Sequence, residues 1–252
     1  MILCFSGTGN SRLVAERLAM LMEHKVTMLC GDVLAHSAGI ELPVEDVIWV
    51  MPVYSWGVPP VVVKWIESLP EGWGTDVCHH IVLTCGDDTG NAHIMWRNIL
   101  KHRGMKAGAC FSVIMPNTYV FMKGFDVDSP DLRDAKLQRM PERVDEIAGK
   151  INNGFSGDDV MRGRWAWLKT SVVYPWFRKY AMNPRKFNVS HDCVSCGKCA
   201  SACPCGNIKL VDRRPVWGDR CALCAACYHI CPRHAVDYGS SARFKGQYNI
   251  NI

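Results

Sequence analysis

The sequence predicts an α/β protein in two parts: a doubly wound sheet of five parallel strands, followed by a smaller, cysteine-rich α+β domain. Three observations lead to this prediction. Short apolar runs alternate with stretches of helical periodicity over residues 1–152, which is typical of parallel strands joined by helices. A turn of small residues follows the first apolar run. Nine of the 14 cysteines lie between Cys193 and Cys231.

The elements of the sheet follow from this apolar pattern. The expected strands are Ile2–Ser6, Lys25–Leu29, Val47–Val50, Ile81–Cys85 and Ala109–Met115. The expected helices are Ser11–Glu23, Val58–Leu69, Ala92–Arg103 and Asp131–Asn152. Because a phosphate-type turn follows the first strand, we expect the strand order 2-1-3-4-5, with a ligand at the carboxyl ends of the strands.

Three segments are expected along the chain: a sheet domain (1–152), a basic, aromatic-rich linker or bridging helix (153–187) and the cysteine-rich domain with its tail (188–252). From Val160 to Ser190 there are seven Lys/Arg and seven aromatic residues but no acidic residue. One interpretation is a docking surface for an acidic partner or a membrane face. The other is a helix that packs its "WAWL" and "YPWF" stretches between two domains and keeps its basic residues in water.

Composition and charge exclude several classes of protein. An apolar content of 48% is ordinary for a folded chain, and a net charge of +5 is too mild to indicate nucleic-acid binding. No basic stretch precedes an apolar one at the start, so we expect no signal peptide. Proline and glycine interrupt the most apolar region, Val47–Ile66, so we expect no transmembrane segment. These features predict a cytoplasmic protein, in which clustered cysteines favour metal ligation over disulfides.

Two cysteine runs share one spacing. Residues 193–204 read CVSCGKCASACP and residues 221–232 read CALCAACYHICP, and both fit C-x2-C-x2-C-x3-C-P. This is the bacterial ferredoxin run for [4Fe–4S] clusters, while zinc is the alternative for isolated C-x2-C pairs. Residues 188–238 closely resemble a two-cluster bacterial ferredoxin. The resemblance implies one cluster on Cys193, Cys196, Cys199 and Cys231 and the other on Cys221, Cys224, Cys227 and Cys203, with Cys205 left over.

The turn Ser6-Gly7-Thr8-Gly9-Asn10-Ser11 lies between a strand and a helix. Its hydroxyls, its backbone N–H groups and the helix N-terminus suit a phosphate. It lacks the lysine of nucleoside-triphosphate loops, so a single phosphomonoester fits better. The alternative is an ordinary helix start capped by Asn10 or Ser11.

This turn resembles the flavodoxin pattern [ST]-x-T-G-x-[ST] at every position. "PVYSWGVP" resembles the flavin loop of that family, with Trp56 stacked on the inner flavin face and the Gly57 peptide at N5, although a plain core role for Trp56 is the alternative. "TCGDDTGNA" resembles the second flavin loop. The implied FMN-binding residues are Ser6, Thr8, Gly9, Asn10, Ser11, Pro52, Val53, Tyr54, Ser55, Trp56, Gly57, Thr84, Cys85, Gly86 and Asp87.

The outer flavin face is a departure from the family. Gly90 aligns where many flavodoxins have a tyrosine, which predicts an uncovered face. The candidates to cover it are the ferredoxin-like domain, a substrate, or the side chain of Tyr54 or Tyr119.

The whole chain resembles flavodoxin–ferredoxin fusion proteins of anaerobic bacteria and archaea. The resemblance implies FMN, two [4Fe–4S] clusters and electron transfer with unidentified protein partners, and a homodimer is compatible with it. One alternative is an FMN-dependent reductase of a small-molecule acceptor, motivated by Gly90 and the nearby Tyr54, His93 and Tyr119. Another is a sensor whose cluster reports oxygen or iron.

Overall fold

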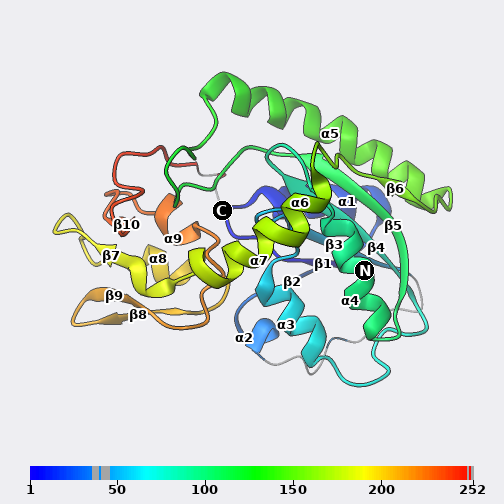
Figure 1. Ribbon diagram of the computed structural model, residues 1–252, viewed down its shortest axis with the longest axis horizontal. Coiled ribbons are helices and arrows are strands. Elements are labelled where there is room, and N and C mark those ends of the chain that lie inside the picture. The colour runs from blue at the N-terminus through cyan, green and yellow to red at the C-terminus, as the bar shows by residue number, and fades with distance from the viewer. Residues whose placement is uncertain (36–39, 41–45, 249, 251–252) are drawn as a thin grey trace.

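The computed structural model describes residues 1–35, 40, 46–248 and 250, and is built around one six-stranded parallel sheet (Figure 1). The strands are β1 (Ile2–Cys4), β2 (Val26–Met28), β3 (Val47–Pro52), β4 (Cys78–Cys85), β5 (Lys106–Ile114) and β6 (Asp158–Asp159). Their order is β2-β1-β3-β4-β5-β6, and every neighbouring pair is parallel. The expected order of the first five strands is therefore confirmed.

The expected count of five strands is wrong, because β6 adds a sixth at the edge. It lies in the segment that the sequence predicts to be a linker, and Asp158 and Asp159 pair with Cys110 and Phe111 of β5. Two acidic residues carry no apolar alternation, so no pattern could reveal this strand.

The central strands are buried on both faces, which explains their continuous apolar runs. The strand β4 begins three residues earlier than expected, because two histidines continue it. His79 is fully buried: its Nδ1 accepts a hydrogen bond from Trp49 Nε1 (3.1 Å) and its Nε2 lies 2.8 Å from the Gly74 carbonyl oxygen. A satisfied imidazole can thus occupy a buried strand, although its polarity hides the strand in the sequence.

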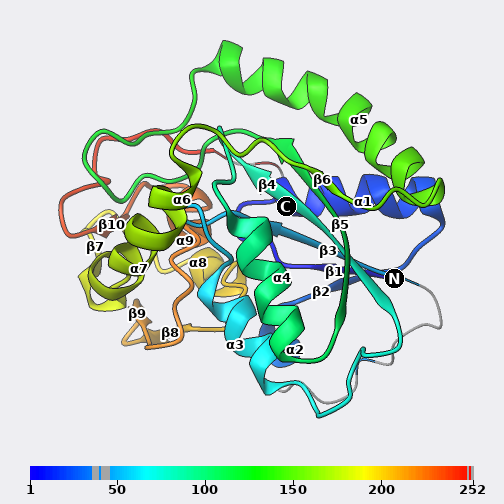
Figure 2. The ribbon, with the colours of Figure 1, turned by 45° about the vertical axis from the view of Figure 1, so that its right-hand side comes forward.

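Helices cover both faces of the sheet (Figure 2). The helices α1 (Asn10–Met22) and α5 (Pro130–Asn152) pack on one face through a cluster that includes Val14, Leu18 and Ile147. On the other face lie α2 (Gly31–Ala35), α3 (Pro60–Ser68) and α4 (Ala92–His102), around Trp65 and Trp96. The short helix α2 was not expected from the sequence. The sheet is therefore doubly wound, as predicted.

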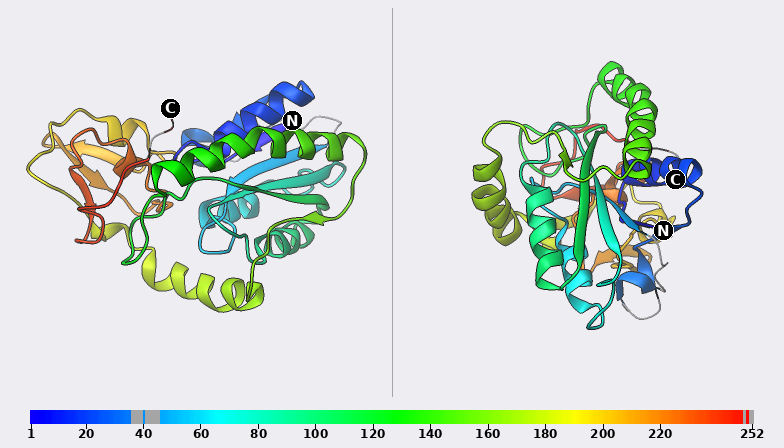
Figure 3. Two further views of the ribbon diagram at one scale, coloured as in Figure 1. Left: turned by 90° about the horizontal axis from the view of Figure 1, so that it is seen from above. Right: turned by 90° about the vertical axis from the view of Figure 1, so that its right-hand side faces the viewer.

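One continuous helix, residues 166–181, follows β6 and runs along the outside of the molecule toward the cysteine-rich part (Figure 3). We call it the bridging helix. It comprises α6 (Ala166–Leu168), the π-helical η1 (Lys169–Val173), α7 (Tyr174–Trp176) and the π-helical η2 (Phe177–Ala181). Tyr174 and Phe177 are buried, whereas Trp165 and Trp167 are 71% and 67% exposed. The interpretation that "WAWL" packs between two domains is therefore wrong for its tryptophans.

The cysteine-rich part contains only short elements. They are η3 (Pro184–Lys186), β7 (Phe187–Val189), α8 (Lys198–Ser201), β8 (Ile208–Val211), β9 (Arg214–Trp217), α9 (Ala226–His229) and β10 (Val236–Tyr238). The strands form two antiparallel pairs, β7 with β10 and β8 with β9. Their apolar cluster includes Val120 and Phe121 from the loop after β5, together with Phe177. The two parts of the chain thus share a core.

Among the residues that the structure describes, no helix is both long and apolar enough to cross a membrane.

Candidate functional site

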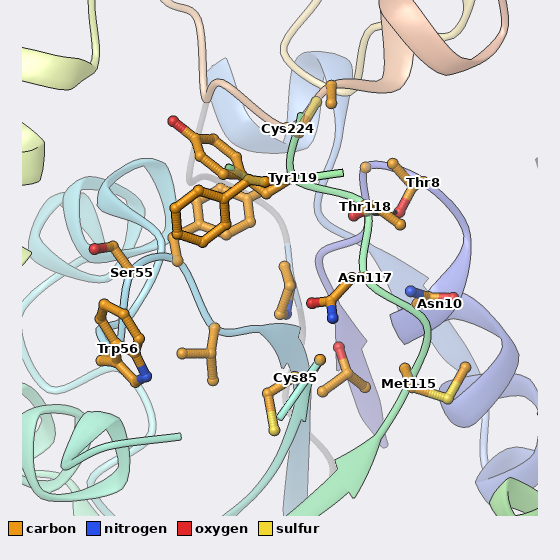
Figure 4. A pocket seen from close by; sticks show the side chains of 18 of the residues that line it. Thr8, Asn10, Ser55, Trp56, Cys85, Met115, Asn117, Thr118, Tyr119 and Cys224 are labelled. Atoms are coloured by element: carbon orange, nitrogen blue, oxygen red, sulfur yellow. Dashed lines mark hydrogen bonds between the residues drawn. The ribbon is translucent and has the colours of Figure 1, made fainter. Parts of the chain in front are cut away.

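A cavity of about 370 Å³ opens at the carboxyl ends of the strands (Figure 4). The loops after β1, β3, β4 and β5 form it, and the bridging helix and residues 223–225 close it. The residues of the predicted FMN site that line it are Ser6, Thr8, Asn10, Ser11, Pro52, Val53, Tyr54, Ser55, Trp56, Thr84, Cys85, Gly86 and Asp87. Of the predicted set, Gly9 and Gly57 are not in the cavity wall.

The turn after β1 leads directly into α1. Gly9 precedes the helix with a left-handed backbone (φ 98°), a conformation that glycine adopts without strain, and Arg12 N–H donates to Ser6 Oγ (3.4 Å). Ser11 Oγ instead lies 2.7 Å from Thr84 Oγ1, and Asn10 Nδ2 donates to the Pro116 carbonyl (2.9 Å). Apart from the Arg12 N–H, which Ser6 accepts, the N–H groups at the start of α1 can serve an anion in the cavity.

Asn10 is also held from the other end of the described chain. Tyr248 Oη donates to Asn10 Oδ1 (2.8 Å), and Tyr248 N–H donates to His229 Nδ1 (3.1 Å). The His229 Nε2 atom lies 2.8 Å from the Thr118 carbonyl oxygen. The segment after β10 thus supports the turn after β1 and the loop after β5 together.

The loop after β3 forms a tight two-residue turn. Tyr54 and Gly57 exchange two backbone hydrogen bonds (3.0 and 3.1 Å), and Ser55 and Trp56 both have positive φ (47° and 63°). Non-glycine residues in this conformation are strained and need support from their surroundings. The strained turn places Ser55 and Trp56 in the cavity wall.

The bridging helix supplies that support. Thr170 Oγ1 donates to the Trp56 carbonyl (2.7 Å), and Lys169 Nζ lies 5.1 Å from the centroid of the Trp56 ring. Tyr174 Oη donates to the Val58 carbonyl (2.6 Å), and the Tyr174 ring packs so closely on Gly57 that a Cβ there would overlap it. Gly57 therefore faces this helix, and the structure does not bring it to the cavity.

The loop after β5, residues 115–125, is a wall of the site that the sequence analysis missed apart from Tyr119. Asn117 packs against Gly86, where any Cβ would overlap the Asn117 amide. The Asp128 carboxylate accepts hydrogen bonds from the Asn117 backbone N–H and from Asn117 Nδ2 (both 3.0 Å). Lys136 Nζ pairs with the same carboxylate (2.7 Å). The rule that ligands bind at the carboxyl ends of parallel strands could have pointed to this loop.

Aromatic side chains line the side of the cavity next to this loop. Tyr119 makes edge contacts with Phe125 and Phe177, at 5.7 and 5.9 Å between ring centroids. Its hydroxyl is buried without a hydrogen-bond partner, and burial raises its pKa above the ordinary value. Gly90 lies behind Trp56 and Thr170, outside the cavity wall, so it leaves no opening there.

Each set of four cysteines implied by the ferredoxin resemblance surrounds a separate small hollow. The outer cysteine group is Cys193, Cys196, Cys199 and Cys231. The inner cysteine group is Cys203, Cys221, Cys224 and Cys227, and Cys205 lies beside it. All 14 cysteines, every one in the described part of the chain, are free thiols.

The inner cysteine group adjoins the large cavity. Cys224 lines both the cavity and the hollow of its own group. It packs directly on the turn after β1, since a Cβ on Gly7 would lie 2.5 Å from Cys224 Cβ. A hydrogen bond from Gly31 N–H, at the start of α2, to the Pro204 carbonyl (2.8 Å) joins the cysteine-rich part to the segment after β2.

Backbone N–H groups point at the sulfur atoms of both groups. Leu223 N–H donates to Cys221 Sγ (3.3 Å), Asn207 N–H to Cys203 Sγ (3.4 Å) and Ala235 N–H to Cys231 Sγ (3.3 Å). Burial raises the pKa of Cys221 to about 11 and that of Cys224 well above its ordinary value. These thiols are therefore protonated when nothing is bound, and a positively charged group is needed to ionise them.

The spacing of these sulfur atoms fits a single zinc ion poorly. Tetrahedral Zn–S bonds of about 2.3 Å place the sulfur atoms roughly 3.8 Å apart. Among the described residues, only Asp46, Cys78 and His80 bring three potential ligand atoms within 4.8 Å of one another. The two cysteine groups are wider, as a larger metal group requires.

The Asp46–Cys78–His80 cluster lies at the amino end of β4 and lacks a free histidine nitrogen for a metal. His80 Nδ1 accepts a hydrogen bond from Ala109 N–H (3.0 Å). The proton of the neutral ring is then on Nε2, which donates to Asp46 Oδ2 (3.1 Å). The cluster is satisfied internally and plays no part in the candidate site.

Comparison with solved structures finds similarity to flavodoxin-like proteins. A flavodoxin from Streptococcus pneumoniae TIGR4 aligns with 61% of this chain and 97% of its own (15% identity, TM-score 0.38). A Fusobacterium nucleatum flavodoxin bound to flavin mononucleotide aligns with 62% and 97% (12%, 0.39). An azoreductase from Bacillus anthracis aligns with 59% and 98% (12%, 0.37). No family model and no curated protein sequence matches the chain.

Proposed function

We propose that the protein is an electron-transfer iron–sulfur flavoprotein, with FMN in the large cavity and one [4Fe–4S] cluster on each cysteine group. The observation that carries the proposal is the position of Cys224, which belongs to the inner cysteine group and lines the cavity as well. A metal group held there would be in direct contact with the FMN site. We also propose that the protein is cytoplasmic and exchanges electrons with other redox proteins.

The cavity fits FMN in size and chemistry. A volume of about 370 Å³ lies within the range of small-molecule sites. The lysine-free turn after β1 would hold the single phosphate through the N-terminus of α1, and Trp56 would lie against the ring system. When bound, FMN supplies the link between one-electron and two-electron chemistry.

The cysteine groups fit [4Fe–4S] clusters in number, spacing and environment. Each offers four thiols, as such a cluster requires, and each receives backbone N–H groups at sulfur. Such hydrogen bonds and the degree of burial tune the reduction potential. Cys196 is exposed whereas Cys224 lies against the cavity, so an external redox partner would meet the outer group.

The reductase alternative keeps only part of what motivated it. Gly90 and His93 do not line the cavity, whereas Tyr54 and Tyr119 do. Electron transfer is the better supported function, because Cys224 belongs both to the inner cysteine group and to the cavity wall.

Anaerobic reconstitution of the full chain with iron, sulfide and FMN tests the proposal. We expect about eight iron atoms and one FMN per chain, with electron paramagnetic resonance of the reduced protein showing two interacting clusters. An iron content near one per chain, or unchanged fluorescence of added FMN, would contradict it. Zinc reconstitution under the same conditions is the control for adventitious thiol binding.

A further inference from the structure

The outward side of the bridging helix carries a stripe of exposed apolar and aromatic side chains. Its members are Trp165, Leu168, Val172, Trp176 and Tyr180, with exposed fractions of 71%, 44%, 49%, 50% and 55%. Leu168, Val172, Trp176 and Tyr180 recur every four residues along this mixed α- and π-helix, and Trp165 lies just before its first residue in a left-handed conformation (φ 59°). Ala166, Tyr174 and Phe177 form the opposite, buried face. We call the outward side the aromatic face.

Basic residues flank the aromatic face, and acidic residues are missing from this stretch. Arg162, Arg164 and Lys169 lie at its start and Arg178 and Lys179 at its end, while residues 160–190 contain no aspartate or glutamate. Lys169 is paired with Asp88 (2.5 Å) and Arg162 with Asn91 (2.7 Å). A helix surface with exposed apolar side chains along its length and basic side chains at both ends is complementary to an anionic, partly apolar partner.

We propose that the aromatic face docks on the surface of an anionic lipid bilayer. The bridging helix runs along the outside of the molecule and presents a ridge there (Figure 3). The cavity that it borders lies on its inner side, toward Tyr54 and Tyr119. Tryptophan and tyrosine favour the headgroup region, and lysine and arginine favour anionic headgroups. The helix would lie in the plane of the interface.

Two other occupants fit less well. A second copy of the chain would bring the same basic residues together, and this like-charge contact opposes self-association. An acidic protein would satisfy the charges, but it would need a surface shaped to receive a row of side chains that spans residues 165–180. A lipid surface accepts such a row without shape complementarity.

The aromatic face also borders the large cavity. Trp176 belongs to the face and lines the cavity, and Val173 beside it lines the cavity too. Docking would therefore place the cavity edge at the lipid surface. The docking proposal itself depends on the exposed stripe and its charge, and stands whether or not the cavity holds FMN.

Vesicle binding by the full-length holoprotein tests the proposal. We expect co-sedimentation with vesicles of equal parts phosphatidylglycerol and phosphatidylcholine, and affinity roughly tenfold or more weaker for phosphatidylcholine alone. Lipids brominated near the headgroup should quench part of the tryptophan emission. The double variant Trp165→Ser/Leu168→Ser should bind these vesicles with an affinity lower by roughly tenfold or more, because it removes two inserted apolar side chains.

Two further variants separate the contributions. Phe244→Ser removes a 93% exposed aromatic side chain that lies off the bridging helix and should bind as the parent protein does. Arg164→Gln/Lys179→Gln should weaken binding to anionic vesicles by about fivefold per charge, with no effect on neutral vesicles. Absence of binding to anionic vesicles, or equal binding by the Trp165→Ser/Leu168→Ser variant, overturns the proposal. Two other results also overturn the proposal in favour of a protein partner, provided that the parent protein does not bind vesicles. They are salt-sensitive binding of an acidic protein and self-association, if the Trp165→Ser/Leu168→Ser variant loses either.

Discussion

The inner and outer cysteine groups have the same spacing in the sequence but very different surroundings. The inner group is enclosed by the turn after β1 and shares Cys224 with the large cavity. The outer group lies among residues of the cysteine-rich part alone, and its Cys196 is exposed. Two copies of one motif thus become a group that adjoins the large cavity and a group that faces solvent. The difference arises from what packs against each copy, since their ligand spacing is identical.

The most direct test of this difference removes one ligand from each group. Cys224→Ala should lower the iron content from about eight to about four per chain and also weaken FMN binding, because Cys224 lines the cavity. The matched variant Cys196→Ala should lose a similar amount of iron and bind FMN as the parent protein does. Iron analysis and FMN fluorescence titration measure both effects. Equal loss of FMN affinity in the two variants would remove the distinction between the groups.

A second test crowds the contact between the inner group and the turn after β1. Gly7→Ala would place a Cβ 2.5 Å from Cys224 Cβ, so we expect destabilisation by about 1–3 kcal/mol. FMN affinity should fall together with stability, because the turn must move. Gly149→Ala in α5 is the control: no atom lies near its added Cβ, and the change should stabilise the helix by about 0.5–1 kcal/mol. Denaturant unfolding of the full chain measures both variants, and unchanged stability of Gly7→Ala would contradict the packing.

A third test acts on buried histidines in both parts of the chain. Burial lowers the pKa of His79 in β4 and His93 in α4, and that of His229 in α9 to about 4, so all three are neutral in the folded protein near neutral pH and take up protons on unfolding. Stability is therefore complete above about pH 6.5 and falls as the pH drops below it, by at most about 1.4 kcal/mol per pH unit for each histidine. Thermal unfolding followed by tryptophan fluorescence between pH 7.5 and 5 measures the loss. Stability that is constant over this range would contradict the assignment of neutral, buried rings.

The smallest effect is expected at the turn after β3. Thr170→Val removes the hydroxyl that donates to the Trp56 carbonyl, at a cost of about 1 kcal/mol. FMN affinity should fall about fivefold, because the strained Ser55–Trp56 turn loses its support, while the iron content stays the same. Ser171→Ala, on the exposed side of the same helix, is the control and should bind FMN normally. Loss of iron in Thr170→Val would show that the bridging helix supports the cysteine groups as well.

Regular patterns made much of this fold predictable. Parallel strands and amphipathic helices have clear apolar periods, and all five expected strands lie within three residues of the observed ones at both ends. The missed strand β6 consists of two aspartates, and the missed helix α2 has only five residues. Neither is long enough to show a period. The contact between Gly7 and Cys224 joins residues far apart in the chain, and no local pattern encodes it.

The candidate site was predictable only where its loops resemble known ones. The turn after β1 and the loops after β3 and β4 were expected, whereas Asn117 and Phe125 after β5 have no distinctive spacing. The outward direction of Trp165 and Trp167 was not predictable either, because Trp165 lies before the helix in a left-handed conformation (φ 59°) and the local sequence does not show which side of the helix packs. Tertiary packing decided both features.

The hydrogen bond between Tyr248 and Asn10 has a consequence for synthesis of the protein. The two residues are 238 positions apart, and Cys224 completes the same cavity from almost as far away. A ribosome adds about 5–20 residues per second, so β1 and α1 emerge many seconds before the residues that close their site. The turn after β1 must wait in an open state during this time. Cofactor loading is therefore expected to follow translation.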